Sequence, residues 1–129
     1  MRAISFLLLF TSTLFADQLS NSIFQQYEAG EYAEAASLLQ NLKQQDPDRY
    51  AALPFALLHA KVLLLAGDKK AAFDLYKNLS GDSRFAPFTL LSVARMSASE
   101  GDFPNAIRYY QSYLSHGRYP DTMPLPGRR

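Results

Sequence analysis

Apolar residues recur every three or four positions between Leu19 and His116, which is the spacing of an α-helix with one buried face. Glycine, proline and short polar stretches interrupt this pattern at intervals. The segments between the interruptions predict helices at 19–29, 31–45, 55–66, 68–80, 87–100 and 102–116. The pattern therefore predicts an all-α protein.

The middle of the chain is the most apolar part. Between Phe55 and Ala66 only His59 and Lys61 are not apolar, and a helix that is apolar nearly all round is expected to be buried and central. Residues 48–53 are expected to form a short connector that leads into the second repeat. Asp46-Pro47 stops the preceding helix, because the residue before proline avoids helical angles.

The helices are joined by a motif that occurs three times, at 30–35, 67–72 and 101–106. Each copy reads Gly, an acid, three variable residues and Ala. Glycine suits the left-handed backbone just past a helix end, and the acid suits the positive start of the next helix. The alanine allows two helices to cross closely. The motif therefore predicts a joint between two helices rather than a ligand site.

The residues that follow each alanine repeat as well. The predicted inner faces are Ala35, Leu39 and Leu42; Ala72, Tyr76 and Leu79; and Ala106, Tyr110 and Tyr113. The three glycines, Gly30, Gly67 and Gly101, are spaced by 37 and 34 residues. A period of this length is typical of stacked helix pairs, in which neighbouring pairs bury one another's apolar faces.

These offsets resemble the tetratricopeptide repeat (TPR) family. The resemblance implies a right-handed array of three antiparallel helix hairpins, with repeats at about 19–47, 54–81 and 87–117. The second repeat departs from the family pattern, because Lys69 replaces the aromatic residue and no proline closes the unit. The first helix has Ser22 and Ile23 where the family has Leu and Gly.

Residues 1–16 have the form of a secretory signal peptide. A basic start at Arg2 precedes a short apolar run, and Ala16 precedes a polar stretch, so cleavage is expected before Asp17. An uncleaved anchor and a buried first helix are the alternatives. The repeat domain would then span 17–117, followed by an irregular Pro/Arg-rich tail at 118–129. This arrangement predicts a periplasmic or secreted protein with no stable membrane span after signal removal.

Composition narrows the classes of function. Thirteen basic and twelve acidic residues nearly balance, so no global field attracts nucleic acid. The bases are concentrated in the C-terminal half, which either reflects two solvated faces or serves an anionic partner. The absence of cysteine excludes disulfides, thiolate metal sites and a lipoprotein anchor.

The sequence contains no recognisable catalytic constellation. His59 and His116 stand alone, without the spacing of metal ligands. His59 is expected to pack within its helix, and His116 to lie at a helix C-terminus, where the dipole favours a positive charge. We therefore expect no enzyme, no cofactor and no metal.

The sequence is more informative about a binding face than about catalysis. The TPR resemblance implies that the first helices of the repeats line a concave groove. Phe24, Lys61 and Arg95 each stand six residues before a joint glycine, and Tyr27 lies near them in sequence. Leu57, Leu64 and Leu91 are candidates for an apolar floor. Two cations over such a floor would suit an extended peptide with an acidic group, or an anionic glycan. The alternative is that Lys61 and Arg95 are solvated edges.

A predicted exported helical-repeat domain is compatible with three hypotheses of function. The first is an exported adaptor that binds a peptide segment of another envelope protein. The second is the N-terminal helical region of a peptidoglycan-processing enzyme, similar to a lytic transglycosylase, whose catalytic domain is missing from this sequence. The third is a stabilising module without a ligand of its own.

Overall fold

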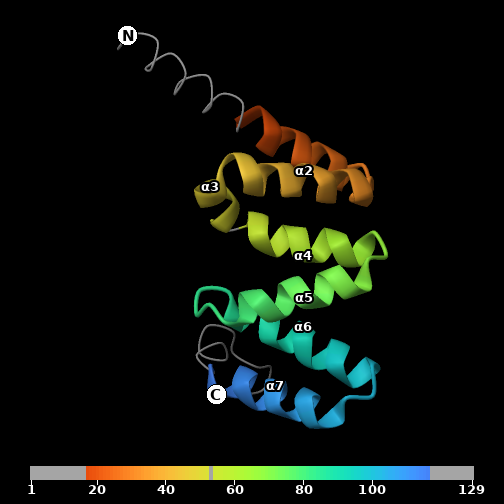
Figure 1. Ribbon diagram of the computed structural model, residues 1–129, viewed down its shortest axis with the longest axis vertical. Helices are drawn as coiled ribbons and strands as arrows, with labels where there is room; N and C mark the ends of the chain where they lie inside the picture. Colours follow the sequence, from red (N-terminus) through yellow and green to blue (C-terminus); the bar gives the residue numbers. More distant parts are fainter. Residues whose placement is uncertain (1–16, 53, 117–129) are drawn as a thin grey trace, which may run out of the picture. The chain divides into compact units, whose positions relative to one another are not determined.

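The computed structural model describes residues 17–52 and 54–116, and every regular element in these ranges is an α-helix (Figure 1). This confirms the all-α prediction. The chain divides into two compact units between Ala72 and Phe73, within helix α5 (Lys69–Ser80). The predicted signal peptide at 1–16 and the predicted tail at 118–129 lie outside the described residues.

Unit 1 contains a helical run at 17–28, followed by α2 (Tyr32–Gln45), α3 (Pro47–Ala51) and α4 (Phe55–Leu65). Helix α4 packs against both α2 and α3. The apolar positions that recur at helical spacing meet in the core, as the sequence pattern predicts. The largest fully buried side chains of this unit are Ile23, Leu39, Leu42 and Val62.

Most of the predicted short connector at 48–53 is a helix, α3, which the sequence analysis did not foresee. The Asp46 side chain accepts a hydrogen bond from the backbone N–H of Arg49 at 3.2 Å, and Pro47 occupies the first turn. An Asp-Pro pair that ends one helix can therefore also begin the next, because aspartate is a good N-cap and proline tolerates the first helical position.

Helix α4 corrects the expectation of a helix that is buried all round. Its buried residues are Phe55, Ala56, His59, Ala60 and Val62. At its C-terminal end, by contrast, Leu64 and Leu65 are 38% and 46% exposed. Apolar composition alone does not show which face of a helix its neighbours cover.

Unit 2 contains the rest of α5, α6 (Ala86–Ser99) and α7 (Phe103–Ser115), and α6 and α7 run antiparallel in close contact (Figure 1). The hydroxyls of Ser80 and Thr89 lie 2.7 Å apart and tie the end of α5 to α6. Ala106 is the buried residue of α7. Tyr110, predicted on the inner face, is 36% exposed, so the prediction for that position is wrong.

The three predicted joints share one backbone geometry. Gly30, Gly67 and Gly101 have φ of 80°, 93° and 82°, in the left-handed region that glycine occupies without steric cost. The N–H of each glycine donates to the carbonyl three residues back, and the N–H of the following acid donates to the carbonyl five residues back, at 2.9 Å each time. This is the Schellman motif, which satisfies the last carbonyls of a helix.

The residue after each glycine begins the next helix, as predicted. The carboxylates of Asp68 and Asp102 accept hydrogen bonds from the backbone N–H groups of Ala71 and Asn105, at 3.2 and 3.4 Å. Glu31 occupies the same position but makes no side-chain cap bond. This is consistent with the preference of N-caps for the shorter aspartate.

Candidate functional site

A cluster of aromatic side chains and one lysine lies on unit 1, where the run 17–28, α2 and α4 approach one another. We call this cluster the aromatic patch. It consists of Phe24, Tyr27, Tyr32, Phe55 and Lys61. The rings of Phe24 and Phe55 have centroids 5.5 Å apart, and those of Tyr27 and Tyr32 are 6.0 Å apart. The Lys61 ammonium lies 5.6 Å from the centroid of the Tyr27 ring, within the range of a cation–π interaction.

The patch is open to solvent. Phe24 is 38% exposed, Lys61 is exposed, and Tyr27 and Tyr32 are half-buried, whereas Phe55 anchors the patch to the core. Glu28 and Glu31, on either side of the joint, are also exposed. The patch therefore offers aromatic faces with one cation resting on a ring. Rings held against one another lose little conformational entropy when they bind a ligand.

The first joint positions two of the four rings. The carbonyl of Tyr27 accepts the N–H of Gly30 at 3.1 Å, so Tyr27 belongs to the last hydrogen-bonded turn before the reversal. Tyr32 is the first residue of α2, immediately after the reversal. The left-handed glycine therefore brings the two tyrosines together across the turn. Lys61 reaches the same place from α4, which packs on α2.

Of the four predicted site residues, Tyr27 and Lys61 contact each other. Phe24 lies three residues before Tyr27 on the same helical run and contacts Phe55. Arg95 is exposed on α6, in unit 2. Of the predicted floor residues, Leu57 and Leu91 are half-buried, and Leu64 is exposed.

Sequence analysis missed Tyr32 and Phe55 as members of the patch. The available signal for Tyr32 was its place in the first motif, two residues after Gly30, where the third motif has Phe103. The signal for Phe55 was weaker. It opens an apolar helix, and only the packing of that helix shows that its ring meets Phe24.

A second polar feature of unit 1 is buried. The Tyr50 hydroxyl lies 2.6 Å from Nδ1 of His59, and the two rings meet edge to face with centroids 5.5 Å apart. Burial raises the pKa of Tyr50 to about 12. Burial, with the nearby charge of Lys43, lowers the pKa of His59 to about 4. At neutral pH the imidazole is therefore uncharged, and its Nδ1 shares a hydrogen bond with the neutral Tyr50 hydroxyl. This confirms that His59 packs within the fold.

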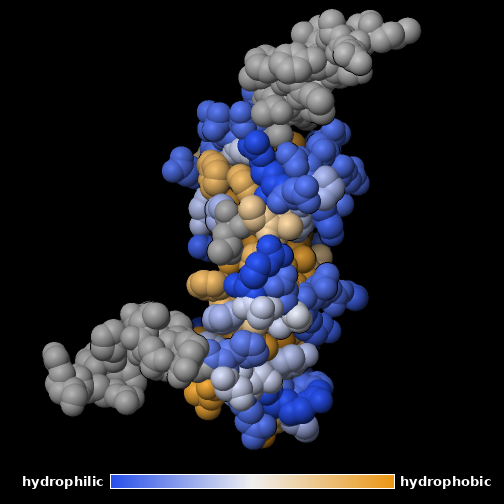
Figure 2. Space-filling model, turned by 90° about the vertical axis from the view of Figure 1, so that its left-hand side faces the viewer, coloured by the Kyte–Doolittle hydropathy of each residue, from blue (hydrophilic) through white to orange (hydrophobic). Residues whose placement is uncertain are grey.

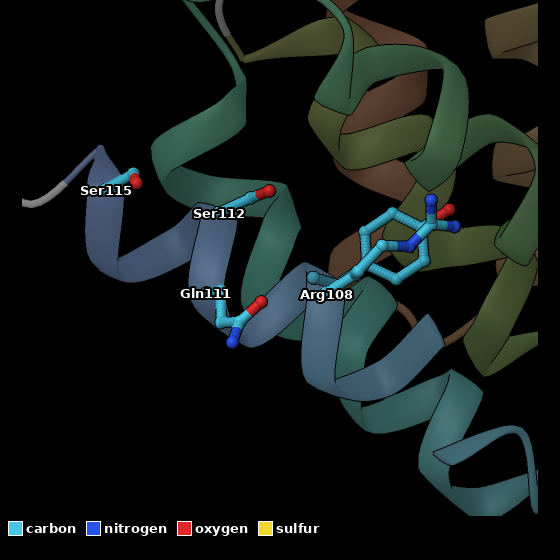
Figure 3. A pocket seen from close by; sticks show the side chains of 5 residues that line it. Arg108, Gln111, Ser112 and Ser115 are labelled. Atoms are coloured by element: carbon cyan, nitrogen blue, oxygen red, sulfur yellow. The ribbon is translucent and has the colours of Figure 1, made fainter. Parts of the chain in front are cut away.

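Helix α7 borders a surface hollow in unit 2 (Figure 3). The residues that line it are Arg108, Tyr109, Gln111, Ser112 and Ser115. All five come from this one helix, so the described residues supply a single wall. Ligand sites usually place polar groups from several elements around one space. The hollow is therefore a weaker candidate for a binding site than the aromatic patch.

Three further observations concern metal binding, membrane crossing and the surface. Across residues 17–52 and 54–116, no three His, Cys, Asp or Glu side chains gather closely enough to hold a metal ion. Within the same ranges, no helix has the length and apolarity that crossing a membrane requires. On the side of the molecule in Figure 2, hydrophobic residues reach the surface in separate groups among hydrophilic ones.

Comparisons with protein-family models, with curated protein sequences and with solved structures find no match to this chain.

Proposed function

We propose that this chain is an exported, non-enzymatic scaffold that binds an extended peptide segment of another envelope protein through the aromatic patch. The scaffold would be a TPR-like right-handed array of three antiparallel helix hairpins. The observation that supports the scaffold is the repetition of one joint, with the same left-handed glycine and the same pair of backbone hydrogen bonds each time. Stacked helix pairs need such a reversal at regular intervals.

The side chains of the aromatic patch suit a peptide that carries both apolar and acidic residues. Half-exposed aromatic rings bind aliphatic or proline side chains by apolar contact, and large aromatic residues contribute much of the affinity at protein interfaces. The Lys61 ammonium stands over the Tyr27 ring at the edge of this surface. It would pair with a carboxylate that the peptide places beside the rings. An extended segment with one acidic residue next to an apolar one fits both features.

A binding experiment tests this proposal. A library of extended peptides that carry one acidic and one apolar residue would be screened against the chain. The affinity of the best peptide would then be measured by calorimetry. Tyr27→Ala should weaken binding by about fivefold or more, since loss of a well-placed aromatic contact costs at least ~1 kcal/mol. Lys61→Glu should weaken the binding of acidic peptides and leave the binding of their amide analogues unchanged.

Lys69→Glu is the matched control for Lys61→Glu, because Lys69 is also exposed in unit 1 but starts α5, outside the patch. It changes net charge equally and should leave the affinity unchanged. Equal losses of peptide affinity for the two charge reversals would show that the effect is nonspecific electrostatic attraction. This result would contradict the proposal. Co-sedimentation with isolated cell-wall sacculi, without peptide binding, would favour the anionic glycan and the peptidoglycan-enzyme hypothesis.

A further inference from the structure

Helix α7 carries an exposed apolar stripe on unit 2. It consists of Phe103, Ile107, Tyr110 and Leu114, which are 61%, 56%, 36% and 70% exposed. Their spacing of four, three and four residues places them on one face of the helix. Ala106, which lies outside this set, is the buried residue of α7, and the helix packs against α6. We call these four residues the α7 stripe.

We infer that the α7 stripe is the docking surface for the segment of this chain that follows it, residues 119–126, doubling back along α7. The inference is independent of peptide binding at the aromatic patch. The chain continues directly from the C-cap residue His116 into Gly117. Gly101 follows the C-cap residue Glu100 of α6 in the same way, and there the chain reverses.

The sequence after this glycine repeats part of the preceding joint. Gly101-Asp102-Phe103-Pro104 and Gly117-Arg118-Tyr119-Pro120 share glycine, an aromatic residue two positions later and proline next. In the segment that follows, Pro124 and Pro126 oppose a further helix. A reversal at Gly117 would therefore lead into an extended strap rather than into another helix.

The reach and the apolar spacing of the segment match the stripe. Helix α7 has 13 residues and is therefore about 20 Å long, and an extended proline-rich segment covers this with about seven residues. Met123 and Leu125 lie two residues apart, or ~6 Å in an extended chain, which is the rise along a helix between Ile107 and Phe103. Tyr119 would then lie near Leu114, at the start of the strap.

The charges near the start of α7 and at the end of the segment favour the same antiparallel direction. The end of α7 to which the segment would run has the exposed acids Glu100 and Asp102 beside it. Arg128 and Arg129 follow the apolar part of the segment. An antiparallel strap therefore brings two cations to two acids. Because the segment is tethered next to the stripe, its effective concentration is in the millimolar range, an advantage that an untethered partner lacks.

Disulfide trapping tests this inference, because the chain has no cysteine of its own. Ile107→Cys with Met123→Cys would be compared, in the full chain, with the control pair Gln111→Cys and Met123→Cys. Gln111 is also exposed on α7 but does not belong to the stripe. Oxidation requires Cβ atoms within about 4.5 Å, so the bond reports docking. Far-UV circular dichroism would verify that each variant keeps its helical content.

The inference predicts an intramolecular disulfide that forms at least about tenfold faster for the first pair than for the control, as expected when docking raises the local concentration. Leu125→Asp should slow the formation of this disulfide. Equal rates for the two pairs, or no disulfide at all, would overturn the inference. Dimers linked between copies would also overturn it, and they would assign the stripe to a second copy of the chain.

Discussion

Acidification tests the buried Tyr50–His59 pair, which forms a contact between α3 and α4. The two rings meet between α3 and α4, and the Tyr50 hydroxyl and Nδ1 of His59 are hydrogen-bonded at 2.6 Å. Protonation of the imidazole buries a positive charge, and it does so near the Lys43 cation. Unit 1 should therefore lose stability in acid through this one residue.

The size of the effect follows from the pKa of His59, which folding lowers from 6.5 to about 4. Because the folded pKa lies below the unfolded one, the contribution to stability is complete above pH 6.5. It is lost as the pH falls through about 4. One pKa unit corresponds to ~1.4 kcal/mol, so the full shift is about 3 kcal/mol. Residual solvent contact of the ring reduces this, and we expect about 2–3 kcal/mol between pH 7 and pH 4.

Urea unfolding at pH 7, 5.5 and 4, followed by far-UV circular dichroism, measures this loss. His59→Gln is the matched comparison, since an amide group can still form a hydrogen bond with the Tyr50 hydroxyl but does not titrate. Carboxylates that titrate in the same range contribute equally to both proteins. The free energy of unfolding of the native chain should therefore fall by about 2–3 kcal/mol more than that of the variant. Parallel pH profiles for the two proteins would refute the reasoning.

Three further predictions concern the joints, the core and export. Gly67→Ala should lower the free energy of unfolding by about 1–2 kcal/mol because its φ is 93°, whereas Gly81→Ala, without a positive φ, should cost less; equal costs by thermal melting would contradict this. Ala72→Leu should overpack a fully buried position and cost about 1–3 kcal/mol, against almost nothing for the exposed Ala33→Leu; a variant as stable as the native chain would contradict the assigned register. In a bacterial host, N-terminal sequencing of the exported chain should begin at Asp17, and a retained Met1 would refute cleavage.

The joints were predictable because their causes are local. Gly30, Gly67 and Gly101 each adopt the left-handed backbone, and Asp68 and Asp102 each cap a helix, for reasons contained within six neighbouring residues. The same holds for the helical period, which places Leu39 and Leu42 in the core.

Features that depend on packing were less predictable. Asp46-Pro47 can end a helix or begin one, and the sequence does not show which of the two dominates, so α3 was missed. Leu64 and Leu65 are as apolar as the buried residues of α4, and only the arrangement of its neighbours leaves them exposed.

The candidate site also combines residues that a local pattern predicts with residues that only packing brings together. Phe24 and Lys61 were selected by their shared offset from a joint glycine, and the structure places both in the aromatic patch. Phe55 joins them through a contact across 31 positions of sequence, which no local pattern encodes. A shared offset also selected Arg95, which lies in the other unit.

The most direct test of the peptide-binding proposal is to map the bound peptide on the protein. The isotope-labelled chain would be titrated with the tightest acidic peptide from the screen, and amide and aromatic NMR signals would be followed. The proposal predicts that the largest shifts cluster at Phe24, Tyr27, Tyr32, Phe55 and Lys61. Shifts concentrated on α6 or α7, with the tyrosines of the patch unchanged, would contradict it.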